Sequence, residues 1–203
     1  TKYVKLMLAK PLDGQVFDTS SNAIWSDSSL YSYLNNDFIN DEINASVDNG
    51  ITQIAINNGY WYQPAFPSSI QTIPANYLST IKNISEYTHD YIGLIDVDDY
   101  VLAASGNEST GRNSCLTSEI FAAPWPTDCI NTSWLLKEFS EPKLWTTASN
   151  GTTVLTVQNG KLIAADPNTK GIATPLSIYL PAGSQIISGD GSSNDPYVIE
   201  TNS

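Results

Sequence analysis

The spacing of hydrophobic positions changes along the chain, from a helical period in the first part to a strand period in the second. A strand-forming run at 3–8 is followed by apolar residues at three- and four-residue intervals: Leu30, Tyr33, Leu34 and Phe38. This spacing predicts an amphipathic helix over 28–39, with Ser26 or Asp27 as its N-cap. A second short helix is expected over 41–47.

The segment 91–104 combines a strand signal with a helix signal. A short apolar run at 92–95 predicts a buried strand, and Asp96 directly after it is a suitable N-cap. Helical spacing then continues along one apolar face: Val97, Tyr100, Val101 and Ala104. Gly106 is expected to end this helix, because glycine readily adopts the left-handed conformation found after helix C-termini.

Strand and turn signals dominate elsewhere. Residues 51–62 are expected to form a strand that runs into a hairpin, and 63–74 a loop. Nearer the end of the chain, alternating or aromatic-rich runs predict six strands: 133–136, 143–147, 152–157, 161–164, 173–180 and 197–199. Asn159-Gly160 is a strong hairpin turn between two of them.

Helices and strands are segregated and do not alternate, which predicts an α+β domain with antiparallel sheet. Short helices of the N-terminal half are expected to pack on antiparallel β-sheet of the C-terminal half, with long loops. With 203 residues, 41% hydrophobic and 10% aromatic, the chain can bury a core and is expected to form one domain, 1–203.

Nine basic and twenty-one acidic residues give a net charge of −12, which excludes two classes of partner. Nucleic-acid binding without sequence preference needs basic side chains to replace counterions at the phosphates. Docking on an anionic membrane needs basic side chains as well. The sequence has no run of about 18 apolar residues, so no membrane insertion of this segment is expected.

Few side chains can titrate near neutral pH, and this disfavours an enzyme. The chain holds one histidine, His89, one arginine, Arg112, and two cysteines. Acid–base and nucleophilic catalysis most often use histidine or activated cysteine, and no glycine-rich, zinc-binding or serine-hydrolase motif occurs. We therefore expect a non-enzymatic protein without a cofactor. A carboxylate-based hydrolase stays as an alternative, since many acidic pairs are available.

Cys115 and Cys129 are expected to form a disulfide across an irregular surface loop. Two cysteines in a secreted chain of low charge usually pair, and closing a loop of about 15 residues stabilises by around 3 kcal/mol. The alternative is two unpaired thiols in a cytosolic protein. Pairing, which we favour, implies an oxidising, extracellular location. Thr1-Lys2 does not begin a signal peptide, so a signal or anchor is expected to have been removed upstream.

Two acidic clusters are weak Ca²⁺ candidates. The first consists of Asp96, Asp98 and Asp99. It lacks the spacing of an EF-hand loop and suits the first turn of a helix, where acids complement the dipole. The second consists of Asp190 and Asp195 with Ser192 and Asn194 between them. It suits a β-turn whose side chains bond their own backbone, so we expect no metal at either cluster.

Aromatic side chains beside turns are the candidate ligand-binding residues. We expect four of them to be exposed: Tyr60, Trp61, Tyr62 and Trp125. Exposed rings anchor protein partners and also suit the apolar face of a sugar. For Trp125 the alternative is a lid packed over the core. Trp134 and Trp145 lie in apolar strand context and are expected in the core.

The order of several segments resembles a known family. These are W-x-x-S-x-L and Y-L-N-N-x-F within 25–38, I-G-L-I and D-D-Y-V-L-A within 92–103, W-L-L at 134–136, and G-I-A-T-P-L-S-I-Y-L at 171–180. A tail at 187–199 reads I-S-G-D-G and then P-Y-V-I. Together they resemble the DUF6273 domains of bacterial surface proteins. The chain departs from the family at Thr174, where the family has an arginine before its proline.

This resemblance implies a C-type-lectin-like fold, similar also to formylglycine-generating enzymes, on a bacterial cell surface. It implies adhesion or display as the function, as a pilus-associated, minor pilin-like subunit that recognises a glycan or a protein. The alternative is a purely structural pilin-type subunit of a surface filament. Expected partners are other surface or pilus subunits, or a host or environmental glycan or protein.

Overall fold

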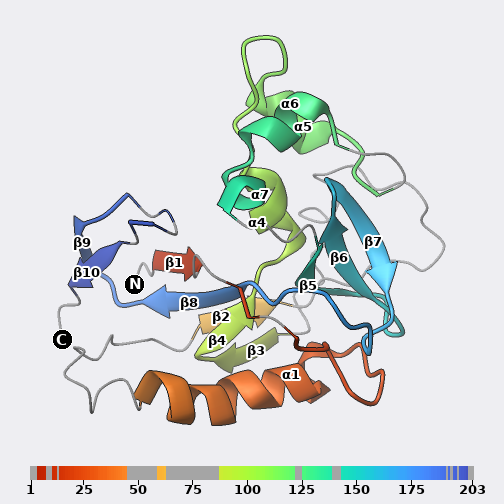
Figure 1. Cartoon of the computed structure of the whole chain (residues 1–203), viewed down its shortest axis with the longest axis vertical. Coiled ribbons are helices and arrows are strands. Elements are labelled where there is room, and N and C mark those ends of the chain that lie inside the picture. Colours follow the sequence, from red (N-terminus) through yellow and green to blue (C-terminus); the bar gives the residue numbers. More distant parts are fainter. Residues whose placement is uncertain are drawn as a thin grey trace.

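The computed structural model describes residues 4–7, 11–12, 14–44, 59–62, 87–121, 125–138, 143–190, 192, 194–195 and 197–200. These residues form an α+β fold with small antiparallel sheets, which confirms the predicted class (Figure 1). Helices come mainly in the earlier part of the chain and most strands in the later part.

One antiparallel sheet joins segments from the two ends of the chain and from its middle. Its strands, in spatial order, are β1 (Val4–Met7), β8 (Leu176–Leu180) and β4 (Ile92–Leu94). Lys5 of β1 lies opposite Tyr179 of β8, and Gly93 of β4 lies opposite Ser177. The predicted strands at 3–8, 92–95 and 173–180 are confirmed in this sheet. β1 is an edge strand, and β8 is its one strand partner within the described residues.

A helix covers one face of this sheet, as the apolar spacing predicts. It comprises three consecutive elements: η1 (Trp25–Asp27), α1 (Ser29–Ser32) and η2 (Tyr33–Asn44). The N-cap of α1 is Ser28, whose hydroxyl accepts a hydrogen bond from the Tyr31 N–H at 3.1 Å. The predicted caps, Ser26 and Asp27, are wrong because both lie inside the 3-10 turn η1.

Two predicted elements lie partly outside the described residues. The predicted helix 41–47 begins inside η2, which ends at Asn44, and 45–47 are not described. Of the predicted strand 51–62, the structure describes β2 (Gly59–Tyr62), which pairs with β3 (Tyr87–Asp90). The predicted loop 63–74 lies outside the described residues.

A second antiparallel sheet runs through the interior of the molecule. Its strands are β5 (Lys143–Ser149), β6 (Val154–Gln158) and β7 (Lys161–Ala165). Asn159 and Gly160 have φ of 50° and 76°, so the predicted hairpin turn is confirmed. Hydrophobic clusters lie on both sides of β6, with Leu155 in one and Val154 in the other. The sheet therefore separates two hydrophobic clusters and packs against both.

Four short helices form what we call the helical lobe, above this sheet in Figure 1. They are α4 (Val97–Leu102), α5 (Arg112–Thr117), α6 (Thr127–Thr132) and α7 (Trp134–Glu138). Asp96 caps α4, as predicted. Its carboxylate accepts from the Asp99 N–H at 2.9 Å, and the Asp99 carboxylate accepts from the Asp96 N–H at 2.9 Å.

The predicted disulfide between Cys115 and Cys129 is confirmed, with 5.6 Å between the two Cα atoms. It joins α5 to α6, and both cysteines are fully buried. The segment between them was expected to be an irregular surface loop. It instead carries parts of two helices, so the bond lies within the core of the lobe.

The predicted strand 133–136 is wrong, because these residues enter α7. Short apolar runs fit a strand or a helix equally well, and tertiary contacts decide between them. Here the Ser133 hydroxyl accepts from the Leu136 N–H at 3.4 Å, and the Trp134 N–H bonds to the Ala103 carbonyl at 3.1 Å. Leu135 is buried while Trp134 is half exposed.

A small hairpin extends beyond the end of β8, at the left of Figure 1. It pairs β9 (Gln185–Ser188) with β10 (Val198–Glu200). β10 confirms the strand predicted at 197–199, while β9 had not been predicted. Among the described residues, no helix combines the length and the apolar character needed to span a bilayer.

Candidate functional site

Trp61 was predicted as an exposed ring, and this is wrong: it is 2% exposed. Its Nε1–H donates to the Asp90 carbonyl at 2.9 Å, and its ring lies 4.9 Å from that of Tyr179. A side chain at Gly93 would collide with this ring, so the glycine leaves room for it. Tyr60 and Tyr62 flank it on β2, and their side chains lie outside the described part of the structure.

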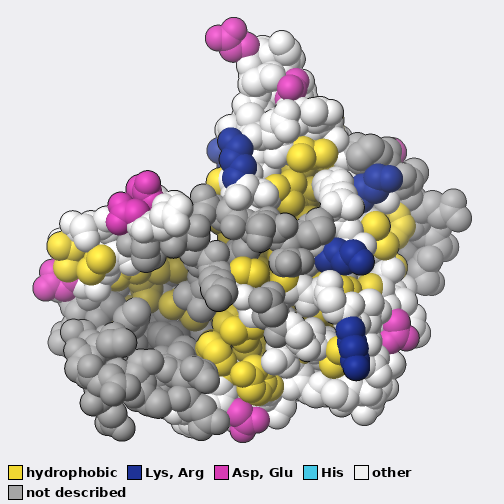
Figure 2. All heavy atoms as spheres, viewed as in Figure 1, with side chains coloured by type: hydrophobic (Ala, Val, Ile, Leu, Met, Phe, Trp, Pro, Cys, Tyr) yellow, Lys and Arg dark blue, Asp and Glu magenta, His cyan; other side chains and the backbone are white. Residues whose placement is uncertain are grey.

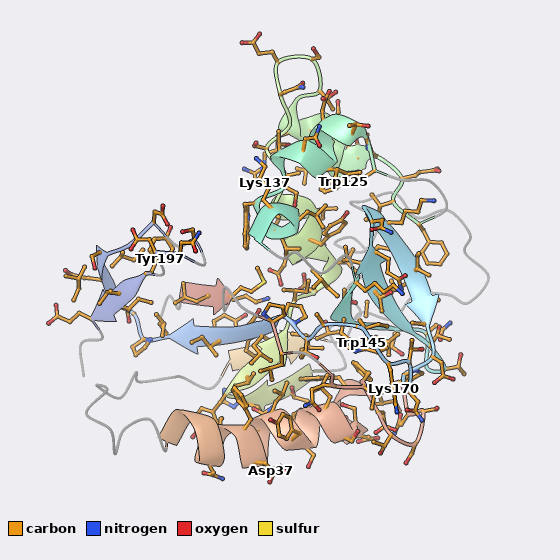
Figure 3. All side chains as sticks on the ribbon, in the orientation of Figure 1. Asp37, Trp125, Lys137, Trp145, Lys170 and Tyr197 are labelled. Atoms are coloured by element: carbon orange, nitrogen blue, oxygen red, sulfur yellow. A yellow bond between two sulfur atoms is a disulfide. The ribbon has the colours of Figure 1, made fainter. Side chains whose placement is uncertain are left out.

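Trp125 was also predicted to be exposed, and it is 1% exposed. Its ring packs 4.9 Å from that of Tyr100, and its Nε1–H donates to the Cys115 carbonyl at 2.9 Å. Its backbone N–H bonds to the Gly160 carbonyl at 2.9 Å. Figure 3 shows Trp125 within the helical lobe. The alternative interpretation, a ring packed into the core, therefore holds for this residue.

Trp134, predicted to be in the core, is the exposed tryptophan: it is 50% exposed, whereas the other four are at most 2% exposed. The reason is the wrong strand prediction. In α7 the adjacent Leu135 takes the buried side, and the indole points outward. Trp145 is fully buried, as predicted.

A groove borders β1, and Trp134 lies on its wall. It has a volume of about 530 Å³ and is lined by 5–7 of β1, by Trp134, and by Asp190, Ser192 and Tyr197 of the hairpin that joins β9 and β10. We call it the β1 groove. Figure 3 shows Tyr197 on the hairpin, to the left of the helical lobe in this view.

A smaller cavity of about 180 Å³ opens beside the groove and shares 5–7 and Trp134 with it. It extends toward α4, where Asp99 and Leu102 line it, and toward Ser177 of β8. We call it the side pocket. Ser177 is 1% exposed, and within the described residues its Oγ has no hydrogen-bond partner.

Exposed hydrophobic side chains concentrate around these two cavities. Nine large hydrophobic residues are exposed in the described chain, and six line the cavities or lie on the hairpin: Leu102, Trp134, Ile186, Ile187, Tyr197 and Val198. Figure 2 shows hydrophobic side chains gathered on the hairpin, with acidic side chains beside them. Exposed apolar side chains that gather in one region mark an interaction site more often than scattered single residues do.

In the side pocket Lys5 forms an ion pair with Asp99, and the carboxylate of Asp96 lies nearby. Lys5 Nζ donates to Asp99 Oδ2 at 2.5 Å and lies 5.4 Å from the centre of the Trp61 ring. Burial alone would lower the pKa of Lys5, but the charges of Asp99 and Asp96 outweigh it and raise that pKa. Burial and the charge of Asp96 raise the pKa of Asp99, although Lys5 opposes them. Asp96 therefore adds a second negative charge beside the Lys5–Asp99 pair.

The two acidic clusters serve caps and turns in the structure. Asp96 and Asp99 form the capping box of α4, and Asp98 lies in the same first turn. In the hairpin loop, Asp190 Oδ1 accepts from the Ser192 N–H at 2.9 Å, and Ser192 Oγ accepts from the Asp195 N–H at 3.1 Å. No group of three or more metal-ligating side chains is found in the described part of the chain.

No family model, no curated protein and no solved structure matches this chain. The geometry defines a class: a disulfide-bonded α+β domain with an aromatic-lined groove beside an edge strand, β1, that pairs with one other strand of the described chain. Sequence reasoning missed four residues of this groove and its pocket: Lys5, Trp134, Ser177 and Tyr197. Only Tyr197 carried a signal, since it stands in a turn-rich segment just as the chosen aromatic residues do.

Proposed function

We propose that this chain is a non-enzymatic extracellular recognition domain, used for adhesion or display on a bacterial cell surface. The β1 groove is its binding site. The observation that carries the proposal is the gathering of exposed apolar side chains around that groove, which include the single exposed tryptophan among the five. Exposed aromatic anchors of this kind dominate the energetics of recognition surfaces.

Two further observations support this setting. The Cys115–Cys129 bond belongs to the core of the helical lobe, and such bonds persist in oxidising compartments. The cavities that border β1 are lined by one lysine and two aspartates, with no histidine or cysteine among the described residues that line them. The lysine is held by one of those aspartates, which suits binding better than proton transfer.

A purely structural subunit of a surface filament is the second candidate. The observation that favours it is the hairpin, where Ile186 and Ile187 are 56% and 62% exposed on successive positions of β9. The pairing of β9 with β10 is irregular at this point, and both isoleucines meet solvent. Contacts between neighbouring subunits would cover them, and the same groove would then receive a neighbour.

Tryptophan fluorescence on the intact domain tests the proposal, because Trp134 is the one indole that solvent reaches. The domain is applied to a glycan array and to a peptide array, and positive compounds are then titrated while acrylamide quenching is followed. We expect a bound ligand to protect Trp134 from quenching, and Trp134→Ala to abolish binding with no change of fold. Tyr91→Ala is the matched control, since Tyr91 is an exposed aromatic residue outside the groove.

Two results would contradict this proposal. One is turnover of any compound that is lost when a single carboxylate of the side pocket is neutralised. The other is an absence of ligands on both arrays, together with self-association of Trp134→Ala at the wild-type level. Only the second candidate, a structural subunit of a filament, would then remain.

A further inference from the structure

We infer that the β1 groove binds an extended peptide segment of a partner protein, which adds as a strand to the open edge of β1 and places a lysine or arginine side chain in the side pocket. This inference rests on the proposed function and names the class of ligand for the same groove.

The first argument is the position of the groove along β1. Side chains of a strand alternate between its two faces, so Leu6 points to the opposite face from Lys5 and Met7. Leu6 packs against the cluster under the helix η2, whereas Met7 packs against the other cluster. The β1 groove touches all three residues, and none of the described residues that line it belongs to β8, so it borders β1 on the side away from its strand partner.

The second argument is the chemistry of that edge. β1 pairs with β8 on one side, and no other strand of the described chain pairs with its other side. An edge strand offers a row of backbone N–H and C=O groups that an extended peptide matches directly. Figure 1 shows that the side of β1 away from β8 faces the region between the hairpin and the helices α4 and α7. A sugar has no backbone that repeats at the spacing of these groups.

The third argument is the composition of the side pocket, which fits a long basic side chain. Its walls are apolar, with Leu102 and Trp134 at the exposed end, and its inner end carries Asp99 and the buried hydroxyl of Ser177. Apolar walls suit the hydrocarbon stem of a lysine or arginine, and an indole ring attracts the cation. Ser177 Oγ, without a partner in the described chain, can accept a hydrogen bond from that cation.

Charge favours the same ligand. The chain carries a net charge of −12, and the groove is bordered by Asp190. Asp195 and Glu200 lie on the same hairpin. Lys5 is already bonded to Asp99, and the charge of Asp96 acts on both groups, so two carboxylates stand against one cation. A second cation in the pocket would reduce this imbalance.

The test uses the full chain and short synthetic peptides of alternating threonine and valine, with Lys, Leu or Glu at one central position. Affinity is measured by fluorescence anisotropy. We expect the Lys peptide to bind about tenfold or more tightly than the Glu peptide. In an added strand, alternate N–H groups point to β1. N-methylation of one alternate set should therefore weaken binding about tenfold, while N-methylation of the other set should not.

Variants of the chain assign the binding to the side pocket. Ser177→Ala removes a buried hydroxyl that has no partner among the described residues, so the free protein should be no less stable, while affinity for the Lys peptide falls several-fold. Trp134→Ala should also weaken it, and Tyr91→Ala should not. If Ser177 served folding alone, Ser177→Ala and the wild type would bind the Lys peptide equally well. The hydroxyl would then be no part of the proposed site.

Each other outcome is decisive. Equal affinity for the Lys, Leu and Glu peptides, or equal effects of the two N-methylated sets, overturns the inference. Binding to glycans and to no peptide also overturns it, while the proposed recognition function survives. Binding to neither class, with Trp134→Ala behaving as the wild type, removes both the inference and the proposed function.

Discussion

The molecule contains two hairpins of similar composition whose apolar side chains have opposite environments. In β6–β7, the residues Val154 and Leu155 are fully buried on the two faces of one strand. In β9–β10, Ile186 and Ile187 are successive residues of one strand, and both are more than half exposed. Both hairpins thus carry successive apolar residues, but only the first has a hydrophobic cluster against each face.

The two hairpins differ in what the rest of the chain packs against them. The turn of the first hairpin is bonded to the helical lobe, through the Trp125 N–H to the Gly160 carbonyl and the Leu162 N–H to the Ile120 carbonyl at 2.6 Å. An isolated two-stranded hairpin is marginally stable in water, and exposed isoleucines add nothing to folding. The exposed isoleucines of β9 are therefore available for contacts outside the folded monomer, which agrees with the proposed binding role of the β1 groove.

The largest expected effect separates the two hairpins directly. Leu155→Ala should reduce the free energy of unfolding by roughly 2–5 kcal/mol, because it opens a cavity in a closed core. Ile187→Ala, the matched variant, should change it by less than about 0.5 kcal/mol. Urea denaturation followed by circular dichroism measures both. Similar losses for the two variants would mean that the monomer itself buries β9.

Loss of the disulfide should destabilise the helical lobe, which packs against the buried hairpin. Replacing Cys115 and Cys129 by alanine opens a loop of about 15 residues, and we expect a loss of around 3 kcal/mol by thermal denaturation. Intact mass without reductant should be lower by two hydrogens than after reduction. Rapid reaction of the native protein with a maleimide would contradict the bond.

Two aspartates, one buried and one on the exposed hairpin, should differ in how they make stability depend on pH. Asp18, 4% exposed, accepts from the backbone N–H groups of Ser20, Asn22 and Ser29 at 2.7–2.9 Å. Burial alone would raise the pKa of Asp18, but these hydrogen bonds outweigh it and lower that pKa. Asp190 makes a similar turn bond on the exposed hairpin, and its hydrogen bonds with Ser192 lower its pKa.

Because the pKa of Asp18 is lower in the folded state, its stabilisation is complete above the unfolded value of about 3.9 and is lost as the pH falls. We expect Asp18→Asn to cost roughly 1.5–3 kcal/mol at pH 7, with the difference from wild type vanishing in strong acid. Asp190→Asn should leave the melting temperature unchanged. An Asp18→Asn loss that is independent of pH would assign the effect to packing.

The smallest effect concerns the turn of the buried hairpin. Gly160 has a positive φ, and a side chain added there would meet Ile130 of α6. Gly160→Ala should cost about 1–3 kcal/mol from backbone strain and overpacking. Gly151→Ala isolates the first cause, because Gly151 also has a positive φ but faces open space. Equal losses for the two variants would show that the contact with Ile130 is unimportant.

Much of the fold could be predicted from the sequence, because the features involved are local. The Asp96 cap requires only a carboxylate three residues before the backbone N–H from which it accepts a hydrogen bond. The Asn159-Gly160 turn requires two residues that tolerate positive φ. The predicted helix over 28–39 follows from spacing alone. The pairing of Cys115 with Cys129 follows from a count of two cysteines.

The candidate site could not be predicted in this way, because it depends on contacts between distant segments. Trp61 is buried because Gly93, far along the chain, leaves room for its ring. Trp134 is exposed because tertiary contacts turn an apolar run into a helix whose next residue faces the core. By itself the sequence determined the Asp96 cap, the Asn159-Gly160 turn, the helical periodicity and the charge, since each involves neighbours in the chain. Only the tertiary structure decided which aromatic rings meet solvent, since burial depends on what the rest of the chain packs against them.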